Sequence, residues 1–593
     1  MPGRRPAVVL KVGLSSTCLD SGRVSPKTLW PALGLLFGVA WAQQAPAAEP
    51  APPAPAEAPA AEAVPAAESP PLPAPERAMP GFAELEQAGA IIGQVVVVAR
   101  DIFDTTDPKE NNALFRAANA VHIQTRESVV RRALLFKPGD RVSVRALEET
   151  ERLLRASNYL YDVRFRPLAW RDGVVDIEVS TRDTWSLDLG VRASRAGGAN
   201  TTGLKITEHN LLGTGTTLSF GRTNDVDRSS NEIQIANERA FGTWVNASLN
   251  LATNSDGRND SISVVRPFYA LDARWAAGVS ASRYDRIDPV YNAGEVESQY
   301  RHRQRAAEVF GGWSAGLIEG RAQRYSLGLA FQDDAYAVEP GLVAPAQLPA
   351  DQRLVGPFFG YELATDRYAR ETNRNLMGRP EFFALGLTST ARLGWASTAL
   401  GSSENALLYQ GSLSGGMEPG PEQTLVASGH IQGRYADGRV SRQQLGGDVQ
   451  YYLPQGPRWL FYASAAGDLL TNPDPDQTLY LGGDNGLRGY PLRYQNGSRR
   501  FLFTVEERFY TDIFLWQLFR IGGAAFYDVG RAWGEGGLNT VNPGWLHDLG
   551  FGLRIVSARS AFGNVIHVDV AVPLNATPDI QKVQLIVKTK TAF

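Results

Sequence analysis

The motif in this sequence that most resembles a site of covalent chemistry surrounds Ser314, in the run Gly312-Trp313-Ser314-Ala315-Gly316. This run matches the G-x-S-x-G pattern of serine hydrolases, in which a strand, a sharp turn and a following helix expose the nucleophile. Here the serine lies at the end of an alternating β-type run, and no helical pattern follows it. An esterase that uses Ser314 is therefore the least favoured of three functions considered below.

The sequence does not support metal, thiol or cofactor chemistry. Its six histidines are scattered without ligand spacing: His122, His209, His302, His430, His547 and His567. The one cysteine, Cys18, lies in a segment that we expect to be cleaved, which excludes disulfides and thiolate sites from the mature chain. There is no phosphate-binding P-loop and no dinucleotide fingerprint. We therefore predict no metal, no cofactor and no enzymatic activity.

A third set of residues that could do chemistry is charged. It lies in segments where apolar and polar residues alternate. In one segment, apolar positions alternate with Phe526, Asp528 and Gly530: Ile521, Ala525, Tyr527, Val529 and Trp533. In the segment before it, apolar positions alternate with Glu506 and Arg508: Phe501, Phe503, Val505 and Phe509. If the apolar positions face lipid, the intervening side chains face a polar interior. An interior carboxylate needs a cationic partner, so the chemistry indicated is non-covalent charge pairing.

Alternation of this kind extends over residues 184–593, and no convincing helical pattern interrupts it. Examples are the runs Trp185 to Arg192, Phe383 to Thr388, Leu549 to Ile555 and Ile566 to Val572. A sheet in hydrocarbon must close, because every unpaired edge group costs several kcal/mol there. We therefore predict a mainly β fold, a transmembrane antiparallel β-barrel, and count up to about 20 alternating runs.

The last predicted strand has a residue pattern that resembles an assembly signal. Its apolar face consists of Val583, Leu585, Val587, Thr589, Thr591 and Phe593. A terminal strand that ends on an aromatic residue resembles the signal by which outer-membrane barrels are recognised for assembly. The resemblance assigns this role to Leu585, Val587 and Phe593, although the two threonines stand where that signal is usually more apolar.

Two segments precede the parts that are expected to fold. Lys27, an apolar run from Leu29 to Ala40 and an Ala-Trp-Ala site predict a secretory signal peptide in residues 1–42. Val24 is an alternative start, since the stretch before Lys27 is long for such a signal. Residues 43–88 are rich in Ala, Pro and Glu and are predicted to be a disordered linker.

Residues 89–183 predict a small α+β domain with the order β-α-α-β-β. The predicted strands are 91–98, 159–168 and 174–181, and the predicted helices begin at Thr125 and Ser143. The runs Arg131 to Asp140 and Leu153 to Leu160 resemble a POTRA domain. This resemblance implies a periplasmic module that pairs extended client segments by β-augmentation. The alternative is a structural plug or spacer domain.

A loop between the predicted strands 459–470 and 501–510 contains the most specific motif, Leu481-Gly482-Gly483-Asp484-Asn485-Gly486-Leu487-Arg488-Gly489-Tyr490-Pro491. It resembles the loop of the BamA/TamA family of outer-membrane assembly and translocation barrels (the bacterial surface antigen type). Supporting matches are the runs Asn210 to Gly215 and Phe526 to Gly530. The resemblance implies 16 strands, which conflicts with the raw count. The excess runs lie between Glu297 and Tyr451, where some are expected to be extracellular hairpins.

The resemblance also implies that the loop tip, Arg488-Gly489-Tyr490, folds back into the barrel. Arg488 would then offer Asp528 a planar bidentate donor, which lysine could not match. The same region would contain Phe526, Gly530, Glu506 and Arg508. Two interpretations of this predicted loop lock stay open: it holds the closing seam or the pore in a working arrangement, or it only braces a rigid barrel.

Taken together, these features predict an outer-membrane insertase or translocase with its POTRA-like domain in the periplasm. Its partners would be outer-membrane lipids, an unfolded client polypeptide, and periplasmic chaperones or accessory subunits. Nucleic acid is not expected, because 59 basic and 62 acidic residues leave a net charge of only -3. The main alternative is a passive outer-membrane pore of the same fold. The sequence does not name the client.

Overall fold

A computed structural model describes residues 79–157, 159–483, 485–535, 544–557, 565–578 and 580–590, with the side chains of 189–194 left out. The predicted signal peptide, most of the predicted linker, and Phe593 of the predicted assembly signal lie outside the described residues. Within the described ranges, no helix is long and apolar enough to cross a membrane.

Residues 82–183, which we call the module, form a three-stranded sheet with four helices. The sheet order is β1-β3-β2, with β1 and β3 parallel and β2 and β3 antiparallel. The elements are α1 (Phe82–Gln87), β1 (Ile91–Arg100), α2 (Ala113–Val121), α3 (Glu127–Arg131), α4 (Val144–Arg155), β2 (Leu160–Arg171) and β3 (Val174–Asp183). Asp172 and Gly173 join β2 to β3, and both have the positive φ that a tight two-residue hairpin requires.

Local sequence signals predicted the start of one helix of the module correctly and of another incorrectly. Ser143 caps α4, since its hydroxyl accepts a hydrogen bond from the backbone N–H of Ala146. Thr125 was expected to cap a helix reaching Leu135, but α3 is shorter and starts at Glu127. Tertiary contacts fix Thr125 instead: its hydroxyl accepts from the Asn210 side chain at 2.8 Å, and its backbone N–H donates to Asp183 at 2.7 Å. The sequence also did not reveal α2.

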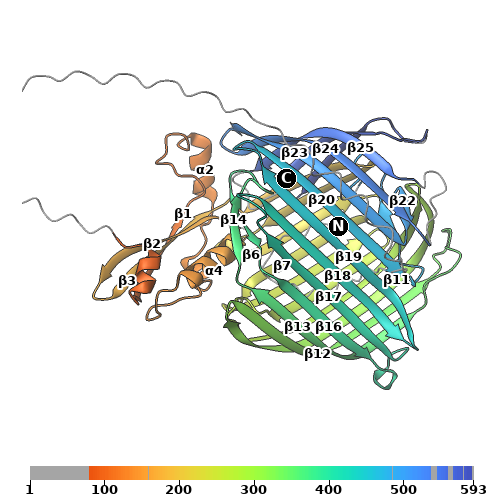
Figure 1. Cartoon of the computed structure of the whole chain (residues 1–593), viewed down its shortest axis with the longest axis horizontal. Coiled ribbons are helices and arrows are strands. Elements are labelled where there is room, and N and C mark those ends of the chain that lie inside the picture. Colours follow the sequence, from red (N-terminus) through yellow and green to blue (C-terminus); the bar gives the residue numbers. More distant parts are fainter. Residues whose placement is uncertain are drawn as a thin grey trace, which may run out of the picture. The chain divides into compact units, whose positions relative to one another are not determined.

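The remaining chain forms a closed antiparallel barrel of twenty strands, which run obliquely around it (Figure 1). The first ten are β4 (Leu187–Ala196), β5 (Ala199–Glu208), β6 (Thr216–Asn224), β7 (Ser229–Ala240), β8 (Val245–Asn254), β9 (Gly257–Arg266), β10 (Trp275–Asn292), β11 (Glu295–Ile318), β12 (Arg321–Ala337) and β13 (Gln352–Thr365). The others are β16 (Thr388–Ala396), β17 (Ala406–Met417), β18 (Thr424–Ala436), β19 (Arg439–Pro454), β20 (Trp459–Thr471), β23 (Arg499–Leu515), β24 (Phe519–Trp533), β25 (Leu546–Ser557), β26 (Val565–Pro573) and β27 (Gln584–Lys590). Two short 3-10 helices, η1 (Leu211–Gly213) and η2 (Thr398–Leu400), lie in connections.

The closed barrel confirms the predicted fold class and corrects the strand number. The 16 strands implied by family resemblance are wrong, and the raw count of about 20 is right. Most runs between Glu297 and Tyr451 are not loop hairpins; they supply β11 to β13 and β16 to β19, each paired with both neighbours. The run that begins at Phe383 starts instead in a hairpin outside the wall. Each strand needs two partners because hydrocarbon does not solvate a free edge.

Side chains alternate across the wall as predicted. On β25, for example, Leu549 and Phe551 are exposed, whereas Asp548 and Arg554 are fully buried. A closed sheet with apolar residues outside and charged residues inside is the architecture of outer-membrane barrels. Because consecutive strands are antiparallel, the connections alternate between two ends. We call the end where β4 begins the module end, and the other the loop end.

Two predicted strands lie elsewhere than expected. The first barrel strand begins at Leu187, and Trp185 instead packs beside the cluster of Ile102, Phe103 and Phe115. The run Phe383 to Thr388 was predicted to be a barrel strand, but Phe383 belongs to a separate two-stranded sheet. This sheet consists of β14 (Tyr368–Thr372) and β15 (Pro380–Ala384) in the connection between β13 and β16. Phe383 and Leu385 are buried in packing and do not face lipid.

Candidate functional site

The connection between β20 and β23, residues 472–498, forms what we call the inward loop. Its base is a small antiparallel sheet of β21 (Leu479–Leu481) and β22 (Gln495–Gly497). Its apolar residues pack with residues of the wall and of the last loop-end connection: Leu481, Leu487, Tyr490, Tyr494, Ala532, Leu546 and Ile580. This packing directs the segment between β21 and β22 into the barrel.

Arg488 at the loop tip binds two carboxylates of the barrel wall. Its Nε and Nη2 donate to the two carboxylate oxygens of Asp528 at 2.7 and 2.8 Å, and Nη1 donates to Glu506 Oε1 at 2.8 Å. The guanidinium also lies 3.3 Å from the ring centroid of Phe526. Asp528 is 0% exposed and Arg488 is 7% exposed. The structure therefore brings Arg488, Asp528, Glu506 and Phe526 together in a desolvated site.

The charges around this pair form a wider network across four strands. Arg508 Nε donates to the second oxygen of Glu506 at 2.9 Å, and the Thr504 hydroxyl donates to Asp528 at 2.8 Å. Two further members, Arg554 on β25 and Asp569 on β26, form an ion pair and are completely buried. Sequence reasoning did not assign these two to the site. They occupy intervening positions in alternating runs, so the argument that placed Asp528 inside applies equally to them.

Gly489 and Tyr490 fit the tip tightly against β25. The backbone N–H of Gly489 donates to Asp548 Oδ2 at 2.9 Å. A Cβ atom on Gly489 would lie 2.6 Å from the Cβ of Asp548, a distance that real structures do not show. The buried Tyr490 hydroxyl donates to the carbonyl oxygen of His547 at 3.0 Å. Glycine at 489 is therefore required by close approach rather than by an unusual φ.

Gly530 has a related role on β24. A Cβ atom there would lie 3.0 Å from the side chain of Leu481, at the base of the inward loop. The absence of a side chain leaves room for that leucine, which is fully buried. All eight residues of the predicted loop lock therefore lie in or beside one network.

The inward loop also contacts both strands of the closing seam. Lys588 Nζ on β27 donates to the carbonyl oxygen of Gly483 at 2.7 Å. At the end of β4, the carbonyl oxygen of Gly197 accepts from the backbone N–H of Leu492 at 3.3 Å. A Cβ atom on Gly197 would come within 2.1 Å of that same nitrogen, so the approach is close. Among the described residues, Val587 and Arg195 are the one Cα pair that joins β27 to β4.

At the loop end, the inward loop is held by a second polar network. Arg493 donates twice to the carboxylate of Asp227 in the β6–β7 turn, at 2.9 and 2.8 Å. Burial raises the pKa of Asp227, but the hydrogen bonds and charge of Arg493 outweigh it and hold this pKa below its ordinary value. Tyr291 donates to the same carboxylate at 2.6 Å. This contact ties the loop to the wall on the other side of the β27–β4 seam from Asp528.

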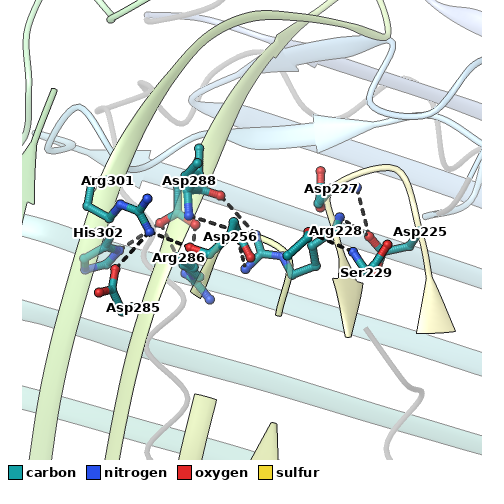
Figure 2. A network of polar contacts seen from close by, with 12 residues as sticks. Asp225, Asp227, Arg228, Ser229, Asp256, Asp285, Arg286, Asp288, Arg301 and His302 are labelled. Carbon is teal, nitrogen blue, oxygen red and sulfur yellow. Dashed lines mark hydrogen bonds and ion pairs between the residues drawn. The ribbon is translucent and has the colours of Figure 1, made fainter. Parts of the chain in front are cut away.

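Figure 2 shows how that network continues along the wall from the β6–β7 turn to β11. Arg228 lies 3.4 Å from Asp256, which accepts from the backbone N–H of Ile287 at 2.9 Å. Farther along, His302 lies between two carboxylates, 2.8 Å from Asp288 and 3.1 Å from Asp334. Acids and bases alternate along this wall, so the interior near the loop end is polar but not of one sign.

The other sequence candidates lie outside this site. Ser314 is within β11, its hydroxyl donates to the carbonyl oxygen of Gln323 at 2.7 Å, and β12 follows it rather than a helix. The side chain is fully buried, which does not suit a nucleophile. Asn210 links the start of the barrel to the module, because its Oδ1 accepts from Gly215 N at 2.7 Å while its amide donates to Thr125. Leu585 is exposed on the outer face of β27, and Val587 shares that face.

Metal ligands are not grouped anywhere in the part of the chain that the structure describes. No set of three or more His, Cys, Asp or Glu side chains there could hold a metal ion. The buried carboxylates of the inward-loop site are instead paired with arginines. Such a site can hold a segment in place through charge.

No protein-family model matches the sequence, and the comparison with curated proteins also finds no match. Comparison with solved structures finds CdiB from Acinetobacter baumannii at 12% identity and a TM-score of 0.40, covering 85% of this chain and 73% of that one. CdiB from Escherichia coli has 12% identity and a TM-score of 0.42, covering 84% of this chain and 76% of that one. BamA from Haemophilus ducreyi, lacking POTRA domains 1–3, has 13% identity and a TM-score of 0.37, with 84% of each chain covered.

Proposed function

We propose that this chain is an outer-membrane insertase or translocase, which receives an unfolded polypeptide in the periplasm and inserts or exports it. The observation that supports this most is the inward loop, which binds the wall through Arg488 and contacts both seam strands. A barrel that only conducts solutes needs no connection between its interior and its seam. A barrel that opens sideways needs one.

The seam is suited to opening because its described pairing is sparse. A single Cα pair joins β27 to β4 among the described residues, whereas seven join β27 to β26. Backbone hydrogen bonds hold sheet strands together, so the described part of this seam separates at less cost than the β26–β27 ladder. Release of the inward loop would remove its contacts with Gly197 and Lys588 and so weaken the seam further. Client strands could then enter the lipid through the gap.

The module would be the receiving part in this proposal. In the order β1-β3-β2, both β1 and β2 are edge strands, and an edge can pair with an extended peptide. The energy would come from client folding and from the burial of its apolar surface in lipid, since the periplasm holds no ATP. Partners would be outer-membrane lipids, the client, and chaperones or accessory subunits that deliver it.

A passive pore is the second candidate function, and a polar cavity favours it. A space of about 220 Å³ lies beside the loop-end network, lined by residues that include Asp225, Arg228, Glu232 and Arg286. Its mixed charges would pass small polar solutes without strong selection for one sign. In this alternative the Arg488 contacts only brace the barrel.

The two candidates are separated by depleting the protein and measuring both the outer-membrane and the secreted proteomes. The depleted strain is complemented with the unmodified chain, with Arg488→Ala, or with the matched control Arg458→Ala. Arg458 pairs with Asp512 on the exposed surface at the module end. We expect specific outer-membrane or secreted proteins to disappear on depletion and to return with the unmodified chain and the control only. An unchanged proteome together with reduced solute uptake would support the pore instead.

A further inference from the structure

A second segment enters the barrel from the end opposite to the inward loop. This module-end hairpin, residues 366–387, connects β13 to β16 and contains β14 and β15, which pair only with each other. Turns between neighbouring barrel strands need only a few residues, as Glu319 and Gly320 between β11 and β12 illustrate. The length and separate sheet of the hairpin therefore call for an explanation that the insertase proposal does not provide.

The hairpin packs against the inner wall through an apolar cluster. Its buried residues Ala369, Met377, Phe383 and Leu385 belong to a cluster that also contains wall residues of β19 to β26: Tyr452, Leu460, Tyr510, Ala524, Val556 and Val565. The ring of Phe383 meets that of Tyr452 edge to face, with 5.6 Å between their centroids. These aromatic and aliphatic side chains exclude water from the contact between the hairpin and this part of the wall.

The hairpin reaches far around the barrel from its own strands. A Cβ atom on Gly378, near the hairpin tip, would lie 2.9 Å from the guanidinium carbon of Arg520 on β24. Between β16 and β24 in the wall lie β17, β18, β19, β20 and β23. In a ring of twenty strands, a segment rooted beside β16 must cross much of the interior to approach β24. Its position is therefore that of a closure and not of a surface turn.

The tip of the hairpin is shaped by one half-buried carboxylate. Glu381 Oε1 accepts three backbone hydrogen bonds, from Arg374 at 3.0 Å, Asn375 at 3.1 Å and Leu376 at 3.1 Å. The side chain of Arg374 is buried and donates to the carbonyl oxygen of Glu422 at 2.6 Å in the next module-end turn. The tip thus has a defined conformation rather than a collapsed one.

The same tip is connected to the Arg488 site through one arginine. Arg508 Nη1 donates to the carbonyl oxygen of Arg374 at 2.9 Å, while its Nε donates to Glu506 at 2.9 Å. Glu506 in turn accepts from Arg488. A continuous chain of buried, charge-assisted contacts therefore joins the segment that enters from the loop end to the segment that enters from the module end.

The hairpin also contacts the module, which belongs to the same compact unit as the barrel. The guanidinium of Arg379 lies 5.2 Å from the ring centroid of Tyr161 on β2. Arg152 on α4 lies 3.5 Å from Asp366 and 4.3 Å from the ring centroid of Tyr368. The hairpin thus contacts both the module and the interior network. A movement of either one would change the contacts that hold the hairpin.

We propose that residues 366–387 are a plug that closes the module end of the barrel, held by its apolar cluster and by the contact of Arg508 with its tip. The plug is a device separate from the inward loop, which enters from the other end of the barrel. This proposal does not depend on which client the protein handles, or on whether it handles one.

The test is single-channel conductance of the purified full chain in planar lipid bilayers. In one variant, residues 368–384 are replaced by Gly-Gly. The ends can be joined because Leu385 N and Gly386 N both donate to the carbonyl oxygen of Arg367 at 2.9 Å. A matched control removes residues 340–349 from the loop-end connection between β12 and β13. We expect conductance to rise several-fold in the plug variant and to stay at the level of the unmodified chain in the control.

A second variant keeps the full length of the hairpin, in case the shortened one does not fold. Glu381→Ala removes the acceptor of three backbone N–H groups and should loosen the tip, raising the frequency of open events. Glu381→Gln keeps an acceptor oxygen and should have a smaller effect. Folding is checked by the shift in electrophoretic mobility on heating. Unchanged conductance in the correctly folded plug variant, or in Glu381→Ala if only that variant folds, would overturn the proposal, whatever the proteome experiment shows.

Discussion

The pairing of Arg488 with Asp528 can be measured by a double-mutant cycle. Arg488→Ala leaves Asp528 without its cation in a site that excludes water, although Thr504 still donates to it. Such a loss costs about 3–5 kcal/mol. Asp528→Ala leaves Arg488 with Glu506, so its effect should be at the lower end of that range. The double variant should be less damaging than the sum of the two single ones.

The size of the coupling follows from the contacts. Two hydrogen bonds join Arg488 to Asp528, and each charge-assisted bond contributes about 1.5–3 kcal/mol net. We therefore expect a coupling free energy of about 3 kcal/mol, which is roughly a hundred-fold in the equilibrium constant for unfolding. The assay is urea unfolding of the barrel in detergent micelles, followed by the fluorescence of its tryptophans.

The matched control is the pair Arg458 and Asp512, whose side chains are 53% and 76% exposed. Exposed pairs contribute about 0–1 kcal/mol, so the same cycle there should show little coupling. If the effects of Arg488→Ala and Asp528→Ala simply add, to within about 0.5 kcal/mol, then the two side chains are not a functional unit and the reasoning is wrong.

Three further predictions concern the loop and the seam. Gly489→Ala should displace the loop tip because its Cβ meets Asp548, and limited proteolysis should then cut the loop faster. The control is Gly311→Ala, where a Cβ meets nothing within 4 Å. Equal cleavage of the two variants would contradict the close-approach argument. The lowered pKa of Asp227 means that its contact with Arg493 stabilises the folded loop above the unfolded pKa of about 4 and is lost as pH falls through the lower folded value. Cleavage by an acid protease should therefore rise at low pH, and Asp227→Asn should remove that pH step. Cysteines at positions 195 and 587, whose Cα atoms are partners across the seam, should form a disulfide that blocks client insertion until it is reduced; full activity of the oxidised protein would argue against lateral opening.

Sequence patterns predicted the strands of the barrel wall better than the segments that lie inside the barrel. Period-2 alternation placed Glu506, Arg508 and Asp528 inside because lipid on one face and polar groups on the other leave little choice. The same alternation gave the better strand count, while the number carried over from family resemblance was wrong. Arg488 lies in a loop without periodicity, so only resemblance pointed to it.

The module-end hairpin shows why the rest was missed. Its run from Phe383 to Thr388 alternates just as a lipid-facing strand does, yet Phe383 packs on Tyr452 inside the barrel. Periodicity reports that one face is apolar, but not whether lipid or protein covers it. Thr125 failed as a helix cap for a similar reason, since its partner Asn210 is distant in sequence. Both errors arise from tertiary contacts that a local pattern does not contain.

The inward loop also has a consequence for the order of folding. Its partners come from opposite extremes of the barrel sequence: Arg493 binds a residue 266 positions earlier, and Gly483 binds Lys588, 105 positions later. Contacts between such distant positions form late, because long stretches of chain must first be brought together. The complete set of loop contacts exists only when the first and last strands are both in place. The inward loop can therefore dock completely only after all strands of the barrel wall have been assembled.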